Sequence, residues 1–462
     1  MQAVLFVYTK GGPPLDYVVP RMAAHAQVHL LALTEIPYKG AAAWQSFLAS
    51  VRHVTVEYET DLADLIAHRA TEVRAEAVLT LSESAVVAVA EACTVLGLRG
   101  AGDNAVRASD RRLMRAAWLE AGIPMPRFAT VRSEAEAHAA AFRLRPPLLL
   151  KSAWSAGSIT HQIIHHPDEA AGAWDAAMGS LRGSALTEFV GLDVPAAVDG
   201  FVLEEIVTGS AADWYTDPDA WGDYVSVEGI VADGEYHPLC VAGKLPTIFP
   251  FTERASIVPA ALPEEHQRRI EALSKAAVDG LGLSTCATYT EIKLGADGAM
   301  WVIETAARVG GAMTARQIEL AFGIDMIGML TRELLGRPVS YPPSMPTQSR
   351  TASASLLVHA VHGDGTPWTE QRTWNSDDRV WAGLLTDDSR IDVVPEASVP
   401  DGDPVPTYDP AGGSTSMAAL CLVTGPTPVA VNRDCRRITD LLYQRLADLK
   451  PTVWRAHGDD DR

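Results

Sequence analysis

Two glutamates on neighbouring extended segments are the first residues whose spacing could do chemistry. In "TYTEIKLGADGAMWVIETAARVGG" (288–311), Glu291 and Glu304 flank an Asp297-Gly298 turn and are equally far from it in sequence. A hairpin would place them roughly opposite, with Cβ atoms about 5 Å apart. Carboxylates so close repel unless a cation lies between them, and Mg²⁺ prefers oxygen ligands. The spacing is compatible with a metal site or with two solvated glutamates on one face of a hairpin.

Charged residues also end or interrupt two other apolar segments. Lys151 ends "PPLLLK" and precedes "SAWSAGS", a small-residue segment that could let backbone N–H groups approach a phosphate. A lysine that merely ends a strand is the ordinary alternative. The run "FVLEEIV" (201–207) contains Glu204 and Glu205, which are either one paired and one exposed acid or part of an adenine hinge. In such a hinge, backbone groups bind the base edge and a carboxylate accepts from its amino group.

Several common catalytic motifs are absent from the sequence. There is no Walker A sequence, GxSxG elbow or HExxH pair. Cys286 has no evident histidine as its base, so we interpret it as a small core residue. The spacing in "HQIIHH" (161–166) is typical of a strand with solvated histidines rather than of a metal site.

Composition limits the classes of protein that this chain can belong to. Its 462 residues predict two or three domains, and 47% hydrophobic with 21% charged residues is typical of a folded globular protein. The net charge of −20 disfavours nucleic acid as a partner, because an acidic surface repels phosphate backbones. Five cysteines without CxxC spacing predict reduced thiols and a cytoplasmic location. We expect the start, "MQAVLFVYTKGG", to be a strand rather than a signal peptide, and no apolar run predicts a membrane span.

The first hundred residues alternate β-rich runs with helical patterns, which predicts a parallel, doubly wound α/β unit. Strands are expected at 3–8, 28–33, 54–58 and 77–81, with a helix at 84–98. The next helix, within 109–126, is predicted to begin at an N-cap, Ser109 or Asp110, and to stop at Gly122.

Two hairpins and a helical segment follow further along the chain. The first hairpin is predicted to turn at Asp233-Gly234 and the second at Asp297-Gly298. A helical pattern covers 315–336 and breaks at Gly323. From about residue 338 the chain is richer in Pro, Ser and Thr, which indicates a separate C-terminal domain.

Taken in order, these elements resemble the ATP-grasp superfamily, and more closely its L-amino acid ligases of the bacilysin-synthetase type. The resemblance covers nearly the whole chain and is most specific in "DYVSVEGIVADGEYHP", "CATYTEIKL" and "IETAARVGG…FGIDM". It implies a mixed α/β and α+β protein with an ATP-grasp fold. The expected parts are an N-terminal doubly wound α/β (pre-ATP-grasp) domain (1–105), the ATP-grasp domain (106–335, with a lid at about 125–205) and a C-terminal α+β domain (336–462).

The resemblance also implies roles for particular residues. Glu291 and Glu304 would bind Mg²⁺, expected as two ions or replaced by Mn²⁺, and Arg308 would contact the transferred phosphoryl group or an acyl phosphate. Lys151 would also act in catalysis by contacting the ATP phosphates. The remaining ATP-binding residues would be Arg111, Gly157, Ser158, Glu204, Glu205, Ile206, Val207 and Lys244. The amino-acid substrate would lie against Tyr289, Arg308, Gly310, Gly311 and Ala312.

The sequence departs from the family pattern at four of these places. Arg111 stands where many members have lysine, which weakens the prediction of an ATP contact there. Ala306 replaces a frequent asparagine and so removes one metal ligand. Tyr289 replaces a histidine, and Ala312 stands where a bulky tryptophan can occur. The last two changes predict a substrate pocket that is larger or differently polar than one for alanine.

The expected activity is ATP-dependent ligation of two amino acids, or of an amino acid to another amine, through an acyl phosphate with release of ADP and phosphate. A γ-glutamyl-type ligase that activates a side-chain carboxylate is one alternative. A nucleotide-binding protein without turnover is another, although Glu291, Glu304, Lys151 and Arg308 argue against it. Small-molecule substrates and no membrane partner are expected. The family allows a homodimer, and the sequence does not identify the substrates.

Overall fold

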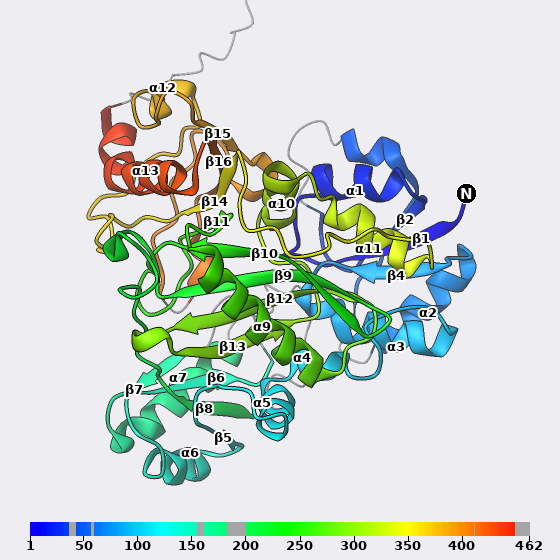
Figure 1. Ribbon diagram of the computed structural model, residues 1–462, viewed down its shortest axis with the longest axis horizontal. Helices are drawn as coiled ribbons and strands as arrows, with labels where there is room; N and C mark the ends of the chain where they lie inside the picture. The colour runs from blue at the N-terminus through cyan, green and yellow to red at the C-terminus, as the bar shows by residue number, and fades with distance from the viewer. Residues whose placement is uncertain (37–42, 57–59, 155–160, 183–199, 411, 449–462) are drawn as a thin grey trace, which may run out of the picture.

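The computed structural model describes residues 1–36, 43–56, 60–154, 161–182, 200–410 and 412–448. Within these ranges the named strands form three sheets, of four, eight and four strands. Figure 1 shows the N-terminal sheet on the right, the second four-stranded sheet at lower left and the large sheet in the centre. No helix of the described ranges has the length and apolar character needed to cross a membrane.

The N-terminal sheet is parallel throughout, with the strand order β3-β2-β1-β4. Its strands are β1 (Ala3–Tyr8), β2 (Gln27–Ala32), β3 (Leu48–His53) and β4 (Ala77–Thr80). Helices α1 (Leu15–Ala23) and α11 (Met326–Leu334) share a core with one face, and α2 (Leu62–Glu72) and α3 (Val86–Leu96) share a core with the other. The doubly wound arrangement is therefore confirmed, with one covering helix supplied by a distant part of the chain.

One predicted strand of this sheet is wrong. Residues 54–56 are irregular and 57–59 lie outside the described residues, whereas β3 occupies Leu48–His53. This edge strand leaves most of its side chains exposed, so its sequence lacks a clear apolar alternation. The apolar residues Val54 and Val56 instead pack from irregular backbone against the core beneath α2 and α3.

The second four-stranded sheet is antiparallel, with the order β5-β8-β6-β7. Its strands are β5 (Phe128–Val131), β6 (Leu148–Ser152), β7 (Gln162–Ile164) and β8 (Phe201–Glu205), and α6 (Glu134–Ala141) and α7 (Ala170–Arg182) share its core. Helices α4 (Ala105–Ser109) and α5 (Arg111–Glu120) lead into it. As predicted, Asp110 caps α5, by accepting from the Arg112 N–H, and the helix ends just before Gly122, whose φ is +68°.

The large sheet is antiparallel, with the order β13-β12-β9-β10-β11-β14-β16-β15. Its strands are β9 (Tyr224–Ala232), β10 (Glu235–Lys244), β11 (Ala255–Val258), β12 (Cys286–Leu294), β13 (Met300–Ala306), β14 (Ala352–Val358), β15 (Arg390–Val393) and β16 (Ala419–Gly425). The sheet thus continues from the predicted ATP-grasp domain into the predicted C-terminal domain. The domain boundaries themselves stay a prediction.

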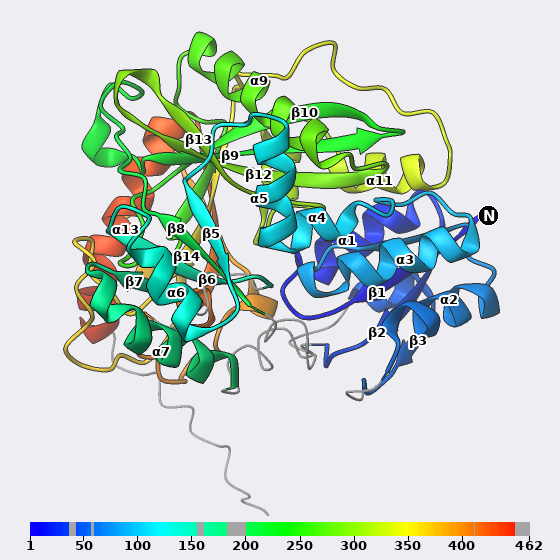
Figure 2. The ribbon, with the colours of Figure 1, turned by 90° about the horizontal axis from the view of Figure 1, so that it is seen from below.

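Helices lie on both faces of the large sheet. Helices α9 (Glu264–Leu281) and α13 (Pro428–Asp448) share the core on one face, together with the short α12 (Asp378–Trp381). Helix α10 (Thr314–Phe322) packs on the other face, toward the N-terminal unit, and Gly323 ends it as predicted. Figure 2 shows α4 and α5 between the N-terminal and second sheets.

The two predicted hairpin turns are confirmed. Asp233 and Gly234 have φ values of +50° and +84° between β9 and β10, and Asp297 and Gly298 have +54° and +70° between β12 and β13. A tight hairpin turn with both central residues in the left-handed region favours Asp-Gly, because glycine and aspartate tolerate that region best.

Candidate active site

A cavity of about 1490 Å³ opens among the three sheets. The loops after β1 and β4, one face of the large sheet and the ends of β6 and β8 contribute to its wall, as does the segment around Glu396 and Met417. Most of the predicted site residues line this cavity: Arg111, Lys151, Glu204, Glu205, Ile206, Val207, Lys244, Tyr289, Glu291, Glu304, Arg308, Gly311 and Ala312. Gly310 is buried next to Gly311, and Gly157 and Ser158 lie outside the described residues. The structure therefore gathers segments that are far apart in sequence around one space.

The two predicted metal-binding glutamates are opposite one another. Glu291 on β12 pairs with Glu304 on β13, next to an irregularity in the register. Burial and the charge of Glu304 together raise the pKa of Glu291, and the Tyr289 hydroxyl donates to its Oε1. Burial also opposes ionisation of Glu304, but Arg111 and Lys151 outweigh it and hold the pKa of this carboxyl below its ordinary value. Arg111 Nη2 lies 3.0 Å from each Glu304 carboxylate oxygen.

This pair fits a hard divalent cation. A cation between the carboxylates would offset the repulsion that raises the pKa of Glu291. No group of three or more His, Cys, Asp or Glu side chains arranged to hold a metal occurs in the described ranges. The two glutamates would thus be the protein's main ligands, and water or substrate phosphate oxygens would fill the rest of the shell, as Mg²⁺ commonly requires.

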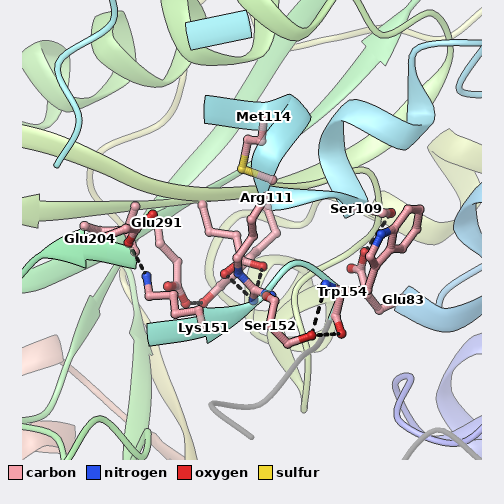
Figure 3. A network of polar contacts seen from close by, with 12 residues as sticks. Glu83, Ser109, Arg111, Met114, Lys151, Ser152, Trp154, Glu204 and Glu291 are labelled. Carbon is pink, nitrogen blue, oxygen red and sulfur yellow. Dashed lines mark hydrogen bonds and ion pairs between the residues drawn. The ribbon is translucent and has the colours of Figure 1, made fainter. Parts of the chain in front are cut away.

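A buried ion-pair network lies beside the carboxylate pair (Figure 3). Glu204 on β8 accepts from Arg115 Nε at 2.6 Å and from Lys151 Nζ at 2.7 Å. Although burial opposes ionisation, the two cations lower the pKa of Glu204 to about 2. The Glu204 side chain is therefore committed to Arg115 and Lys151, and it holds the lysine ammonium at the cavity wall.

Two backbone N–H groups of the predicted adenine hinge (204–207) already donate hydrogen bonds within the protein. The Glu205 N–H donates to the carbonyl of Arg127, and the Ile206 N–H donates to the carbonyl of Pro147. In this conformation these two N–H groups are not available to a base edge. An adenine contact by residues 204–207 stays a prediction, and it would depend on the carbonyl groups of the segment.

Lys244 and Arg308 place two more positive charges on the cavity wall. Lys244 Nζ, at the end of β10, contacts Glu253 at 2.9 Å and the Tyr289 hydroxyl at 3.4 Å. Arg308 Nε donates to Glu83 at 2.8 Å. Glu83 follows β4 of the N-terminal unit, so an acid from one unit orients an arginine of another.

Sequence reasoning missed several residues of this site. It named neither Arg115 nor Glu83. These two belong to the site only through their tertiary contacts, with Glu204 and Arg308 respectively. It also missed Glu228, which is fully buried on β9. Glu228 could have been found from the sequence, because it is a lone acid that interrupts the apolar run "YVSVEGIVA".

Two interpretations of reactive side chains have different outcomes. Cys286 is buried, and burial raises the pKa of its thiol to about 12, which confirms its interpretation as a core residue. His165 and His166 are exposed as expected, but His161 lines the cavity. Both ring nitrogens of His161 are buried without a hydrogen-bond partner among the described residues. The prediction of a solvated side chain is thus wrong for His161, because the cavity wall closes around it.

Known proteins resemble the chain in sequence and in fold, although no protein-family model matches it. Alanine–anticapsin ligase of Bacillus subtilis (strain 168) is 35% identical over 306 residues, which cover 66% of this chain and 63% of that protein. The enzyme of the same name from Bacillus amyloliquefaciens is 33% identical over the same shares. The chain thus spans less than two thirds of the length of these curated relatives.

Solved structures resemble nearly the whole chain. An L-amino acid ligase from Bacillus licheniformis has a TM-score of 0.73 at 18% identity, with 95% of this chain and 97% of that chain covered. A phosphoribosylglycinamide synthetase from Anaerococcus prevotii has a TM-score of 0.60 at 15% identity, with 94% and 98% covered. At these identities the likeness shows a shared fold.

Proposed function

We propose that the chain is a member of the ATP-grasp superfamily and that it is an ATP-dependent ligase that joins two amino acids. In the proposed reaction, a carboxylate oxygen of the first amino acid attacks the γ-phosphorus of ATP, which gives an acyl phosphate and ADP. The amine of the second amino acid then attacks the acyl carbon, phosphate leaves and the amine loses a proton. The product is an amide, and the enzyme forms no covalent intermediate.

The observation that carries the proposal is the convergence of an opposed glutamate pair and several cations on one cavity. Glu291 and Glu304 would hold Mg²⁺, proposed as two ions with Mn²⁺ as a substitute, which neutralises phosphate charge and orients the phosphates when bound. Lys151 and Lys244 would contact phosphate oxygens. Arg308 would stabilise the charge on the transferred phosphoryl group, because guanidinium stays protonated and matches phosphate geometry.

The substrate side chain is proposed to lie at the apolar end of the cavity. Ala312 packs against a cluster that includes Leu357, Leu420 and Met417, all of which line the cavity. A small residue at position 312 leaves room in this cluster for a side chain bulkier than a methyl group. This supports the prediction of a pocket larger than one for alanine.

The proposed location is the cytoplasm, in agreement with five cysteines that are all free and buried. The proposed ligands are small molecules, namely ATP and two amino acids. A second copy of the chain is compatible with the proposal but is not required by it.

The test measures ADP release by the purified protein with ATP, Mg²⁺ and pooled amino acids, with mass spectrometry of the products. We expect release that depends on amino acids and a new condensed mass. Glu304→Ala should lower the rate by about 100-fold or more, because loss of even an outer-shell partner of a metal ligand costs about 10- to 100-fold. The control is Glu235→Gln, which removes an exposed acid at the start of β10 and should leave the rate unchanged.

Other outcomes would replace the proposal. ATP binding without amino-acid-dependent ADP release from any pool would identify a nucleotide-binding protein. Fragmentation that places the new amide on a side-chain carboxyl would identify a γ-glutamyl-type ligase.

A further inference from the structure

Glu228 is a buried acid to which the proposed mechanism gives no role. It lies on β9, paired with Tyr289 on β12 and Cys240 on β10, and its exposure is 0%. Directly opposed residues of antiparallel strands point to the same face, so Glu228 lies on the cavity side of the sheet with Tyr289. Its Oε2 accepts from the Gly310 N–H at 3.1 Å, and its Oε1 has no hydrogen-bond partner among the described residues.

The Gly310 backbone lies so close to Glu228 that position 310 has no space for a side chain. A Cβ atom at position 310 would lie 2.6 Å from Glu228 Oε1 and 2.8 Å from Tyr289 Cδ2, closer than real Cβ contacts. Glycine therefore lets the backbone of the turn after β13 rest directly on the carboxyl group. This turn carries Arg308, whose Nη1 donates to the Val309 carbonyl at 3.0 Å. The turn thus fixes one side of the arginine, and Glu83 fixes the other.

We propose that Glu228 is a positioning residue, which aims Arg308 at the phosphoryl group by anchoring the 308–311 turn through the Gly310 N–H. This inference rests on the proposed function, because it assigns Arg308 to the phosphoryl group. Without the anchor, the guanidinium would keep its partner Glu83 but lose the backbone restraint that sets its distance from the phosphate.

As a neutral acid, Glu228 would accept from Gly310 without drawing Arg308 away from the phosphoryl group. Burial raises the pKa of Glu228 to about 8, although the Gly310 N–H, Lys244 and Arg308 oppose the rise. At pH 7 the carboxyl is therefore mostly protonated and accepts from Gly310 without competing for Arg308. Above pH 8 its negative charge would attract Arg308 and Lys244. The other titratable groups around it are Tyr236, Cys240, Glu253 and Tyr289.

The experiment measures the affinity of the MgADP-saturated protein for inorganic phosphate by calorimetry. Phosphate is the probe because it occupies the position of the transferred group without requiring the amino acids. Arg308→Met should weaken phosphate about tenfold or more, the value of a charge-assisted contact. Glu228→Leu and Glu228→Asp should weaken it similarly, since neither side chain reaches Gly310, while the affinity for MgADP stays within about twofold.

Glu228→Gln separates anchoring from charge. Its amide oxygen can accept from Gly310, so phosphate affinity at pH 7 should stay within about threefold of the wild type. Between pH 7 and 9 the wild type should lose affinity relative to Glu228→Gln, which cannot ionise. The control is Thr290→Val, which breaks the buried Thr290–Thr305 hydrogen bond on the opposite face and should leave phosphate affinity unchanged.

Each outcome decides between the two proposals. If Arg308→Met weakens phosphate but Glu228→Asp does not, the role of Glu228 is refuted and the proposed function stands. An unchanged affinity in Arg308→Met would overturn the assignment of Arg308 and the inference with it. If Glu228→Leu does not fold, Glu228→Asp and the pH dependence of Glu228→Gln still decide the case.

Discussion

Replacing Glu204 with glutamine should destabilise the protein by about 3 kcal/mol at pH 7. The Glu204 side chain is 3% exposed and lies between Arg115, which is fully buried, and Lys151. The fall of its pKa from 4.5 to about 2 is worth about 3 kcal/mol at roughly 1.4 kcal/mol per unit. Removing one partner of a buried ion pair costs about 3–5 kcal/mol, because the remaining charge is left without compensation. The two estimates agree.

The sign of the pH dependence follows from the direction of the shift. Because the pKa of Glu204 is lower in the folded than in the unfolded state, its contribution is present above about pH 4.5 and is lost as the pH falls toward about 2. Urea denaturation, followed by circular dichroism at pH 7, 5 and 3.5, measures the difference between wild type and Glu204→Gln. This difference should shrink by about 1 kcal/mol at the lowest pH.

The neighbouring acid supplies a matched control. Glu205 pairs with Arg127 and Arg145, whose side chains are 58% and 80% exposed. Glu205→Gln should therefore cost less than about 1 kcal/mol, as solvent-exposed pairs do. If Glu204→Gln were no more destabilised than Glu205→Gln, the buried network would not be the stabilising element that we infer.

Three further changes test the geometry of the site. Glu83→Gln should lower kcat for ADP release more than it changes KM for ATP, because it removes the charge that orients Arg308, and equal kcat values would reject that role. Ala312→Trp should shift the products, identified by mass spectrometry from mixed amino acids, toward smaller side chains, and an unchanged product profile would refute the enlarged pocket. Arg111→Met should raise the pKa of Glu304, because it removes the positive charge beside this carboxyl. When the pH is lowered, the variant should therefore lose Mg²⁺-dependent ADP release at a higher pH than the wild type. Arg111→Lys keeps the charge and should keep most of the wild-type pH profile.

Local sequence was sufficient for the elements whose geometry is set by neighbours in the chain. Spacing from the Asp297-Gly298 turn predicted that Glu291 and Glu304 would be opposite, and they are paired. The strands leave the turn with Ile292 opposite Val302, however, and the irregularity next to Glu291 shifts the register so that the two glutamates meet. Asp110 and Gly122 bounded α5 correctly, since capping depends on residues within one turn of the helix end. The failure at 54–58 occurred at an edge strand, where the apolar alternation that indicates a strand is weak.

Tertiary structure decided the partners of the charged side chains. Arg115 and Glu204 are 89 residues apart in sequence, and Glu83 and Arg308 are 225 apart. No periodicity or spacing relates such residues, because their contact depends on how whole sheets pack against each other. Packing also buried His161 and brought the Gly310 backbone onto Glu228. The sequence alone determined which groups could bind phosphate and metal, whereas the fold determined which of them are aimed at the cavity and which hold the others in place.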